Sequence, residues 1–273
     1  MTQALSSRQR TGRRMINGIA VLAMLYLFAP IFMIVLFSFN SPKGKFNIVW
    51  NGFTLDNWAN PFASSELTDA LLVSLRVAFI STICATILGS MIALSLSRYK
   101  FKGSGVVNLF LVLPLTSPEI VLGSSLATLF LARSVEFGYL TVVIAHIMFQ
   151  VSFVAVTVRA RIRGFDWTLE QAALDLGASP QRAFWKITFP LLLPGIMAAA
   201  LLAFALSFDD FIITYFNSGP TETFPKFVYT AAAKGLPGEA NVIGMSVFFL
   251  AIAIVVTVQV RSSLKAKRLA RTK

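Results

Sequence analysis

The chain has 273 residues, of which 56% are hydrophobic and only 13% are charged. A soluble domain averages about 25% charged residues, so this composition excludes a soluble protein of comparable length. Charge-free runs of near membrane-spanning length recur along the chain. They predict an all-α membrane protein, because a helix pairs its own backbone groups in a medium that offers no water.

The N-terminal quarter contains a basic segment, a first span and a polar loop. We expect residues 1–15, which carry several arginines, to be a disordered cytoplasmic segment. The stretch from Ile16 to Phe39 has no charge, is too long for a signal-peptide core and lacks a small-x-small cleavage site at its end. We therefore predict that residues 16–67 form an uncleaved first transmembrane helix and an outer loop, with Trp50 and Trp58 at the membrane interface.

Five more spans are predicted in the segment 68–260, and a basic cytoplasmic tail follows at 261–273. The second predicted span overall ends before a cluster of basic residues. The third is interrupted at Pro114 and at Pro118-Glu119, because proline lacks a backbone donor and breaks a helix. Residues 217–239 are predicted to form a loop rich in Gly and Pro. The predicted spans of this segment are 68–97, 103–132, 137–158, 187–215 and 240–260.

The basic residues are distributed unevenly between the two sides of the predicted bundle. If the N-terminus is cytoplasmic, the inside segments hold 18 of the 24 Lys and Arg residues and the outside loops hold five. Cytoplasmic segments normally carry this excess. Both termini are therefore predicted to be cytoplasmic, and we attribute the net charge of +12 to topology and anionic lipid, not to nucleic-acid binding.

A polar island at 168–190 separates the fourth and fifth predicted spans and has the pattern of two short helices joined by a tight turn. Thr168 is expected to cap the first helix, with Gln171 reaching back in a capping box. Gly177 suits the left-handed residue at the end of that helix. Ser179 is expected to cap the second helix, with Pro180 as its first residue. Such a helix pair at the mouth of a membrane bundle is suited to docking on another protein.

The same island resembles the EAA loop of binding-protein-dependent ABC importer permeases, whose pattern is Glu-Ala-Ala, three residues and Gly. The family's glutamate falls on Gln171, and Glu170 stands one residue earlier. The resemblance covers about residues 68–260 and implies that this loop sits in a groove of an ATPase subunit. The positions that match are Ala172, Ala173, Gly177, Ala178, Ser179, Ile187 and Pro190. The implied coupling residues are Glu170, Gln171, Ala172, Ala173, Gly177, Ser179 and Pro180.

The resemblance also implies an architecture and a set of partners. The architecture is the type I ABC importer permease fold, with six transmembrane helices and a cytoplasmic coupling-helix loop in the bacterial inner membrane. Two ATPase subunits, a second homologous permease subunit and an extracytoplasmic solute-binding protein would complete the transporter. The chain has no Gly-x-x-x-x-Gly-Lys-Ser/Thr pattern, so ATP and Mg are expected to bind to the ATPase subunits. No catalytic residue, cofactor or metal site is predicted in this chain.

Three carboxylates lie within predicted spans, namely Glu119, Asp209 and Asp210. A charged side chain at the bilayer centre costs about 2.5–3.5 kcal/mol on insertion scales, so such residues normally face the bundle interior or a water-filled path. We predict that the three line a path for a cationic solute. The alternative is an internal ion pair, for which Arg76 is the candidate partner. The isolated His146 is expected to be a satisfied interior residue.

The identity of the solute rests on resemblance within the family. Residues 113–123 and 207–220 most resemble the spermidine/putrescine permeases, which implies a polyamine. The first alternative is another small organic solute, such as an opine or an aminophosphonate. A channel or secondary carrier is a remote alternative, because the EAA-like loop would then have no use. Aromatic side chains suited to cation–π contacts with such a solute are Phe149, Phe153, Phe204, Phe208, Phe211 and Tyr215.

Overall fold

The computed structural model describes residues 7–44, 46–99 and 101–271, so predictions for residues 1–6, Lys45, Lys100 and the last two residues lie outside the described residues. Within the described ranges the regular structure is helical, apart from one isolated β-bridge. Contacts divide the chain into two compact units. We call them the central unit, Asp69–Tyr229, and the terminal unit, Met1–Thr68 with Thr230–Lys273.

The terminal unit contains α1 (Ser7–Ser38), α2 (Asp56–Ala59) and α12 (Gly238–Arg271), and α12 packs against both α1 and α2. Because α1 begins at Ser7, the disorder predicted for residues 7–15 is wrong. Arginine and glutamine are good helix formers, and no proline interrupts this stretch. The predicted first span is therefore the apolar part of a longer helix.

Asparagine side chains give the loop after α1 a fixed course. Asn40 Nδ2 donates to Asn47 Oδ1 at 2.6 Å and to the carbonyl of Val49 at 2.8 Å. Asn57 Nδ2 donates to the carbonyls of Ser38 at 3.1 Å and Asn40 at 2.9 Å. Buried backbone groups need such partners where no helix or sheet supplies them. The predicted outer loop is therefore an ordered structure.

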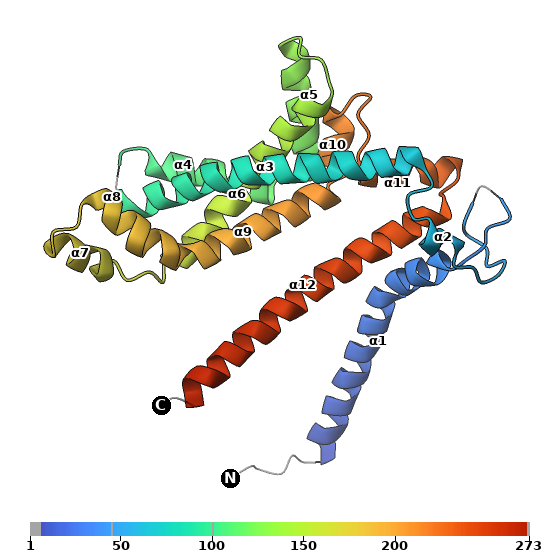
Figure 1. Cartoon of the computed structure of the whole chain (residues 1–273), viewed down its shortest axis with the longest axis horizontal. Coiled ribbons are helices and arrows are strands. Elements are labelled where there is room, and N and C mark those ends of the chain that lie inside the picture. The colour runs from blue at the N-terminus through green and yellow to red at the C-terminus, as the bar shows by residue number, and fades with distance from the viewer. Residues whose placement is uncertain (1–6, 45, 100, 272–273) are drawn as a thin grey trace. The chain divides into compact units, whose positions relative to one another are not determined.

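The central unit is a helical bundle with α6 (Tyr139–Ile162) packed against α4, α5, α9 and α10 (Figure 1). Most of its long helices lie close to the predicted spans. In chain order its other elements are α3 (Ser65–Arg98), α4 (Ser104–Thr116), α5 (Glu119–Ala132), α7 (Thr168–Asp175), α8 (Pro180–Ala183), the π-helix η1 (Phe184–Thr188), α9 (Phe189–Asp209), α10 (Ile212–Asn217) and α11 (Phe224–Lys234), of which α3 and α11 cross the boundary of the unit.

Small side chains bring α3, α6 and α9 close together. The buried cluster between these helices contains Ala85 and Ala93 of α3 together with Ala199 and Ala203 of α9. A Cβ added at Gly89 of α3 would lie 2.7 Å from Val154 of α6. Small residues allow such close approach where lipid supplies no hydrophobic driving force between helices.

Four described helical segments are long and apolar enough to cross a membrane, and the bent pair of α4 and α5 makes a fifth if it is counted as one span. The chain bends by 113° between the two helices of the pair. The predicted sixth span corresponds to α12, whose described apolar part, Gly238–Ile254, is shorter than the others. The number six therefore stays a prediction.

Two predicted boundaries are wrong. The predicted span 187–215 is broken at Asp210, where extended backbone (ψ 124°) separates α9 from α10. The predicted loop 217–239 contains α11. Its Gly and Pro residues lie at the two ends, and Pro225 stands in the first turn of α11, where a helix tolerates proline.

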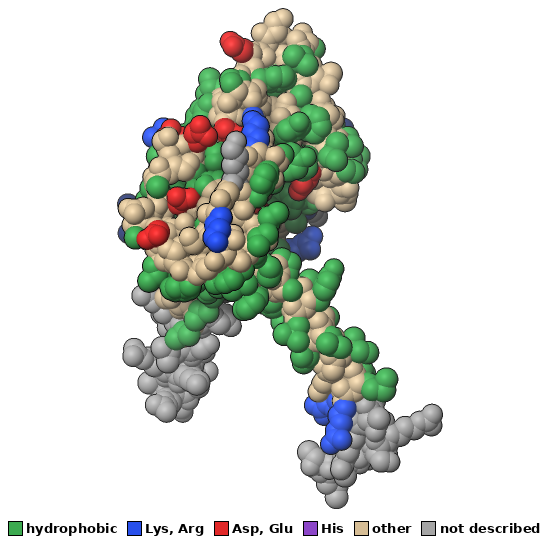
Figure 2. Space-filling model, turned by 90° about the vertical axis from the view of Figure 1, so that its right-hand side faces the viewer, with side chains coloured by type: hydrophobic (Ala, Val, Ile, Leu, Met, Phe, Trp, Pro, Cys, Tyr) green, Lys and Arg blue, Asp and Glu red, His purple; other side chains and the backbone are tan. Residues whose placement is uncertain are grey.

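Hydrophobic side chains cover much of the visible surface (Figure 2). The most apolar window of the first span has no residue buried inside the molecule. Tyr26, for example, is 81% exposed on α1. Such a surface is expected of helices that face lipid or another membrane chain.

Candidate functional site

A cavity of about 470 Å³ lies in the central unit, where two helices are interrupted. One interruption lies between α4 and α5, and the other between α9 and α10. All three predicted path carboxylates line the cavity. The other lining residues are Pro114, Leu115, Ser117, Leu122, Phe149, Phe153, Leu202, Ala205, Leu206, Phe211, Ile212 and Ile213.

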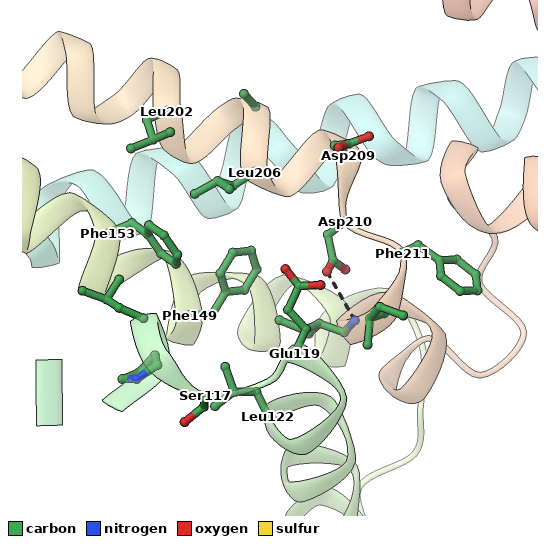
Figure 3. A pocket seen from close by; sticks show the side chains of 15 residues that line it. Ser117, Glu119, Leu122, Phe149, Phe153, Leu202, Leu206, Asp209, Asp210 and Phe211 are labelled. Atoms are coloured by element: carbon green, nitrogen blue, oxygen red, sulfur yellow. Dashed lines mark hydrogen bonds between the residues drawn. The ribbon is translucent and has the colours of Figure 1, made fainter. Parts of the chain in front are cut away.

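The first interruption arises at Ser117 and Pro118, as predicted, but the interruption predicted at Pro114 is wrong, because Pro114 lies within the continuous helix α4. A residue before proline is disfavoured in the helical conformation, and Ser117 is extended with ψ 140°. The Ser117 backbone N–H and hydroxyl both donate to the carbonyl of Leu113, at 2.9 and 2.7 Å, which satisfies the end of α4. Glu119 then begins α5, and its exposed side chain points into the cavity (Figure 3).

Asp210 forms the second interruption and caps the helix that follows. Its carboxylate accepts hydrogen bonds from the backbone N–H of Ile213 at 3.3 Å and of Thr214 at 2.8 Å. It also accepts from the Thr214 hydroxyl at 2.9 Å. These bonds satisfy donors at the start of α10 that would otherwise be unpaired. Asp210 is therefore buried, at 9% exposure, and also lines the cavity.

His146 lies beside Asp210, with its Nε2 3.2 Å from the carboxylate. The imidazole is 1% exposed, with Nδ1 2.6 Å from Ser207 Oγ and Nε2 2.9 Å from Thr214 Oγ1. Ser207 Oγ lies in turn 3.2 Å from Ser81 Oγ of α3. The prediction of a satisfied interior histidine is confirmed. The resulting chain of polar contacts, which we call the His146 network, joins α3, α6, α9 and α10 behind the cavity.

The predicted pairing with Arg76 is wrong. Arg76 is exposed on α3, and no ion pair joins it to either aspartate in the part of the chain that the structure describes. Asp209 is exposed at the end of α9, and its side chain points away from Glu119 and Asp210 in Figure 3. Asp209 is the last residue of α9 and Asp210 is extended, so the two aspartates have different environments.

Three of the six aromatic residues suggested for cation–π contacts line the cavity: Phe149, Phe153 and Phe211. The first two pack edge to face with centroids 6.3 Å apart. The remaining three, Phe204, Phe208 and Tyr215, are not among the lining residues, although Tyr215 packs against the ring of Phe211, which is.

The loop after α6 has the predicted helix-turn-helix geometry. Gly177 has φ +84°, the left-handed conformation expected of it. The N–H of Gly177 donates to Leu174 O and that of Ala178 to Ala173 O, at 2.9 and 3.0 Å, which is the Schellman pattern. Ser179 accepts from the N–H of Arg182 at 3.4 Å, so the predicted second cap is present.

The predicted capping box between Thr168 and Gln171 is wrong. Asp166 takes the capping role, because its carboxylate accepts from the Thr168 hydroxyl at 2.7 Å and from the Thr168 N–H at 3.0 Å. These two bonds, the side-chain bond foremost, hold the pKa of the Asp166 carboxyl below its usual value. A carboxylate is a stronger acceptor than a hydroxyl, which explains why the aspartate two residues earlier displaces the predicted cap.

Glu170 and Gln171, the predicted coupling side chains, differ in accessibility. Gln171 is exposed, whereas Glu170 is buried at 5% exposure and forms a salt bridge with Arg98, the last residue of α3. Glu170 also accepts a hydrogen bond from the buried hydroxyl of Thr188 in η1. Ala172, Ser179 and Pro180 are exposed on the loop, and Ala173 is half-buried. The buried Glu170 therefore makes contacts within this chain, and the exposed residues are the ones available to a partner.

The sequence did not reveal Arg98 and Thr188 as partners of Glu170, or Ser207 and Thr214 as partners of His146. Each pair joins different helices, so no local spacing identifies it. A local signal existed only for Asp166, since Asp two residues before a helix start is a common capping residue.

The family model described as the binding-protein-dependent transport system inner membrane component matches residues 85–266. The chain belongs to this family. It is similar to the spermidine/putrescine transport system permease protein PotC of Escherichia coli K12, with 35% identity over 94% of this chain and 97% of that protein. It is also similar to the putrescine transport system permease protein PotI of the same strain, with 36% identity over 82% of each chain.

Solved structures support the same fold. The chain is similar to a bacterial ABC transporter that imports the acidic polysaccharide alginate, with a TM-score of 0.66, 16% identity and 96% of this chain and 99% of that chain covered. An amino acid ABC transporter has a TM-score of 0.55 and 16% identity, with 75% and 95% covered. The all-α permease fold is therefore confirmed. The chain is a multi-pass membrane component of a transport system that depends on a binding protein.

Proposed function

We propose that the chain is the permease subunit of an ATP-driven ABC importer that carries polyamines such as spermidine and putrescine across the bacterial inner membrane. The observation that carries the proposal is the cavity at two helix breaks, lined by Glu119, Asp209 and Asp210. The names of the relatives, a spermidine/putrescine permease and a putrescine permease, support the same solute class.

The chemistry of the cavity suits a protonated amine. An ammonium group that leaves water needs anionic or carbonyl acceptors, because burying an unpaired charge is costly. Glu119 supplies an exposed carboxylate, and Asp210 supplies a second whose position is fixed by α10 and the His146 network. The rings of Phe149, Phe153 and Phe211 are suited to cation–π contacts. The volume, about 470 Å³, falls within the about 300–1,000 Å³ typical of small-molecule sites.

The chain would act with several partners. A second, homologous permease subunit would supply the other half of the path, and a solute-binding protein would deliver the solute from outside. Two ATPase subunits would bind ATP and Mg and dock on the loop 168–190, since this chain carries no P-loop pattern. In this arrangement both termini and the loop are cytoplasmic, in agreement with the distribution of basic residues.

A second candidate is import of another small organic solute with one cationic group, such as an opine or an aminophosphonate. The observation that favours it is that Asp210 already pairs with His146 and with the start of α10. The exposed Glu119, whose side chain points into the cavity (Figure 3), is then the carboxylate best placed to bind a single ammonium group. A channel or secondary carrier is disfavoured by membership of a binding-protein-dependent family.

Uptake of labelled spermidine tests the proposal, in cells without polyamine uptake of their own that express the complete transporter. We expect saturable uptake that putrescine competes for. Glu119→Gln should raise KM about tenfold or more, because a hydrogen bond to a charged group is worth about 1.5–3 kcal/mol. Glu136→Gln removes an exposed acid that does not line the cavity, so it should transport like the parent.

Different outcomes would overturn the solute assignment, the role of the cavity and the importer assignment separately. Failure of an assembled, ATP-hydrolysing complex to take up any polyamine would overturn the solute assignment and leave family membership standing. Equal KM values for Glu119→Gln and Glu136→Gln would overturn the role of the cavity. Absence of an ATPase from the purified complex would overturn the importer assignment itself.

A further inference from the structure

A buried carboxylate fastens the loop 168–190 to the end of a long helix. Both oxygens of Glu170 are engaged, Oε1 by the guanidinium of Arg98 and Oε2 by the hydroxyl of Thr188. The guanidinium also lies over the indole of Trp167, 5.2 Å from its centroid. We call these four residues the Glu170 clamp. It joins the last residue of α3, the start of α7 and the last residue of η1.

The burial of the clamp makes it hard to open. The Glu170 side chain is 7% exposed and Thr188 is fully buried, whereas the Arg98 side chain is 31% exposed. Removing one partner of a buried ion pair leaves an uncompensated charge and costs far more than the pair contributes. The Arg98 guanidinium is also attracted to the indole ring of Trp167. This attraction does not require Glu170 to lose any more water. The start of α7 is therefore held to α3 through Arg98, and Thr188 ties η1 to the same carboxylate.

The helix α3 also contacts the residues behind the acidic cavity, so it links the clamp to the cavity. Seventeen residues before Arg98, Ser81 of the same helix contacts Ser207 in the His146 network behind the acidic cavity. At a rise of about 1.5 Å per residue, the two positions are about 26 Å apart along one helix. A helix without an internal break transmits displacement between its ends better than a loop does. No break interrupts α3 between these residues.

We infer that Arg98 is a positioning residue that makes α3 the rigid connection between the loop 168–190 and the acidic cavity. In this arrangement Glu170 is an internal anchor, and its carboxylate does not contact the ATPase. Motion imposed on the loop by ATP binding displaces the end of α3 through the clamp, and α3 displaces the His146 network that fixes Asp210. The inference rests on the proposed role of the loop as the ATPase contact.

A charge-swap series tests the clamp in the complete transporter, reconstituted with its ATPase subunits and binding protein. The variants are Arg98→Gln, Arg98→Glu, Glu170→Arg and the double variant Arg98→Glu/Glu170→Arg. The measured quantity is solute transported per ATP hydrolysed, with the amount of co-purified ATPase as the assembly readout. The control is Arg163→Gln, which removes the same charge from an exposed arginine that lines a small pocket together with Ser97.

We expect the single variants to keep the ATPase bound and to lower the transport ratio by about 5- to 150-fold, the range of typical coupling between sites. The double variant should recover most of the ratio, because the ion pair is restored with reversed polarity. A merely structural role would lower assembly and transport together, and the swap would restore both together, whereas the inferred role lowers the transport ratio while the amount of bound ATPase stays the same.

Two results would overturn the inference. One is an unchanged transport ratio in Arg98→Gln, and the other is a double variant no better than the worse of its single variants. Both are distinguishable from failure of the proposed function, which would show as an unmutated complex that lacks the ATPase or does not transport. If the single variants fail to insert, the ratio measured for the inserted double variant decides the question.

Discussion

Neighbouring carboxylates in this chain serve different purposes. Asp210 is enclosed by His146 and by the first turn of α10, Asp209 is exposed, and Glu119 begins α5 at the edge of the cavity. The charge of Asp210 is thus part of the fold as well as of the cavity. The charge of Glu119 has no comparable structural task, so the two residues should respond differently to the same chemical change.

Asp210→Asn should destabilise the protein, whereas Glu119→Gln should not. The amide cannot accept as the carboxylate does from Thr214 and His146, and leaving buried donors unsatisfied costs about 1–3 kcal/mol. Thermal unfolding of the chain in lipid nanodiscs measures the difference. Equal midpoints for the two variants would contradict the capping role of Asp210.

Gly177 is required for its backbone conformation and not for lack of space. A Cβ at this position would meet no atom within 4 Å, yet φ is +84°. A β-branched residue in the left-handed region costs about 1–2 kcal/mol, whereas asparagine visits that region readily. We expect Gly177→Val to abolish uptake while the chain still inserts, and Gly177→Asn to retain most of it. Uptake assays with quantified membrane levels decide; normal uptake by the valine variant would refute the turn's role.

At the scale of elements, breaks and caps encoded by neighbouring residues were predictable. Pro118 marks the end of α4 because its effect acts on the residue just before it. Gly177 and Ser179 likewise act within one turn. These signals place the bent pair and the helix-turn-helix correctly, although the stronger cap at Asp166 competes with Thr168 and was missed.

Features that depend on distant partners were not predictable in this way. The end of α9 at Asp210 has no Pro or Gly signal of its own and depends on His146 of α6, which also contacts Thr214, 68 residues away in sequence. The pairing of Arg98 with Glu170 similarly joins α3 to α7. Such contacts form only when the helices pack together, so they cannot be predicted from composition or from residue spacing.

The close contact between α3 and α6 at Gly89 leaves no room for a larger side chain. Gly89→Val should destabilise the chain by about 1–3 kcal/mol, as overpacking usually does, because the Cβ alone would lie 2.7 Å from Val154 and 2.9 Å from the carbonyl of Val151. The matched control is Gly105→Val in α4, where a Cβ meets nothing within 4 Å. Thermal midpoints of the two variants in nanodiscs test this; a control that falls as far as Gly89→Val would rule out the steric explanation.

For the whole molecule, the topology predicted from the distribution of basic residues can be tested with single cysteines. In a Cys84→Ser background, Val49→Cys lies on the predicted outer loop and Leu176→Cys on the loop 168–190, and both positions are exposed, at 60% and 89%. A membrane-impermeant maleimide should label the first in intact cells and the second only after permeabilisation. Labelling in the reverse order would invert the orientation and remove the loop from the ATPase side.

The π-helix η1 affects how the number of residues before α9 sets the rotation of the loop about the axis of α9. In η1 the N–H of Phe189 reaches back five residues to Phe184 O, and Pro190 follows with no N–H to offer. The π-helix thus contains one extra residue without the rotation of about 100° that a residue adds in an α-helix. Deleting one residue from 184–188 would therefore let the segment close as ordinary α-helix and leave the rotation between the loop and α9 nearly unchanged. Inserting a residue that takes a normal helical step would instead turn the loop by about 100° about the axis of α9 and move Glu170 away from Arg98. The π-helix thus allows one additional residue between the loop and the span at almost no change in the angle between them.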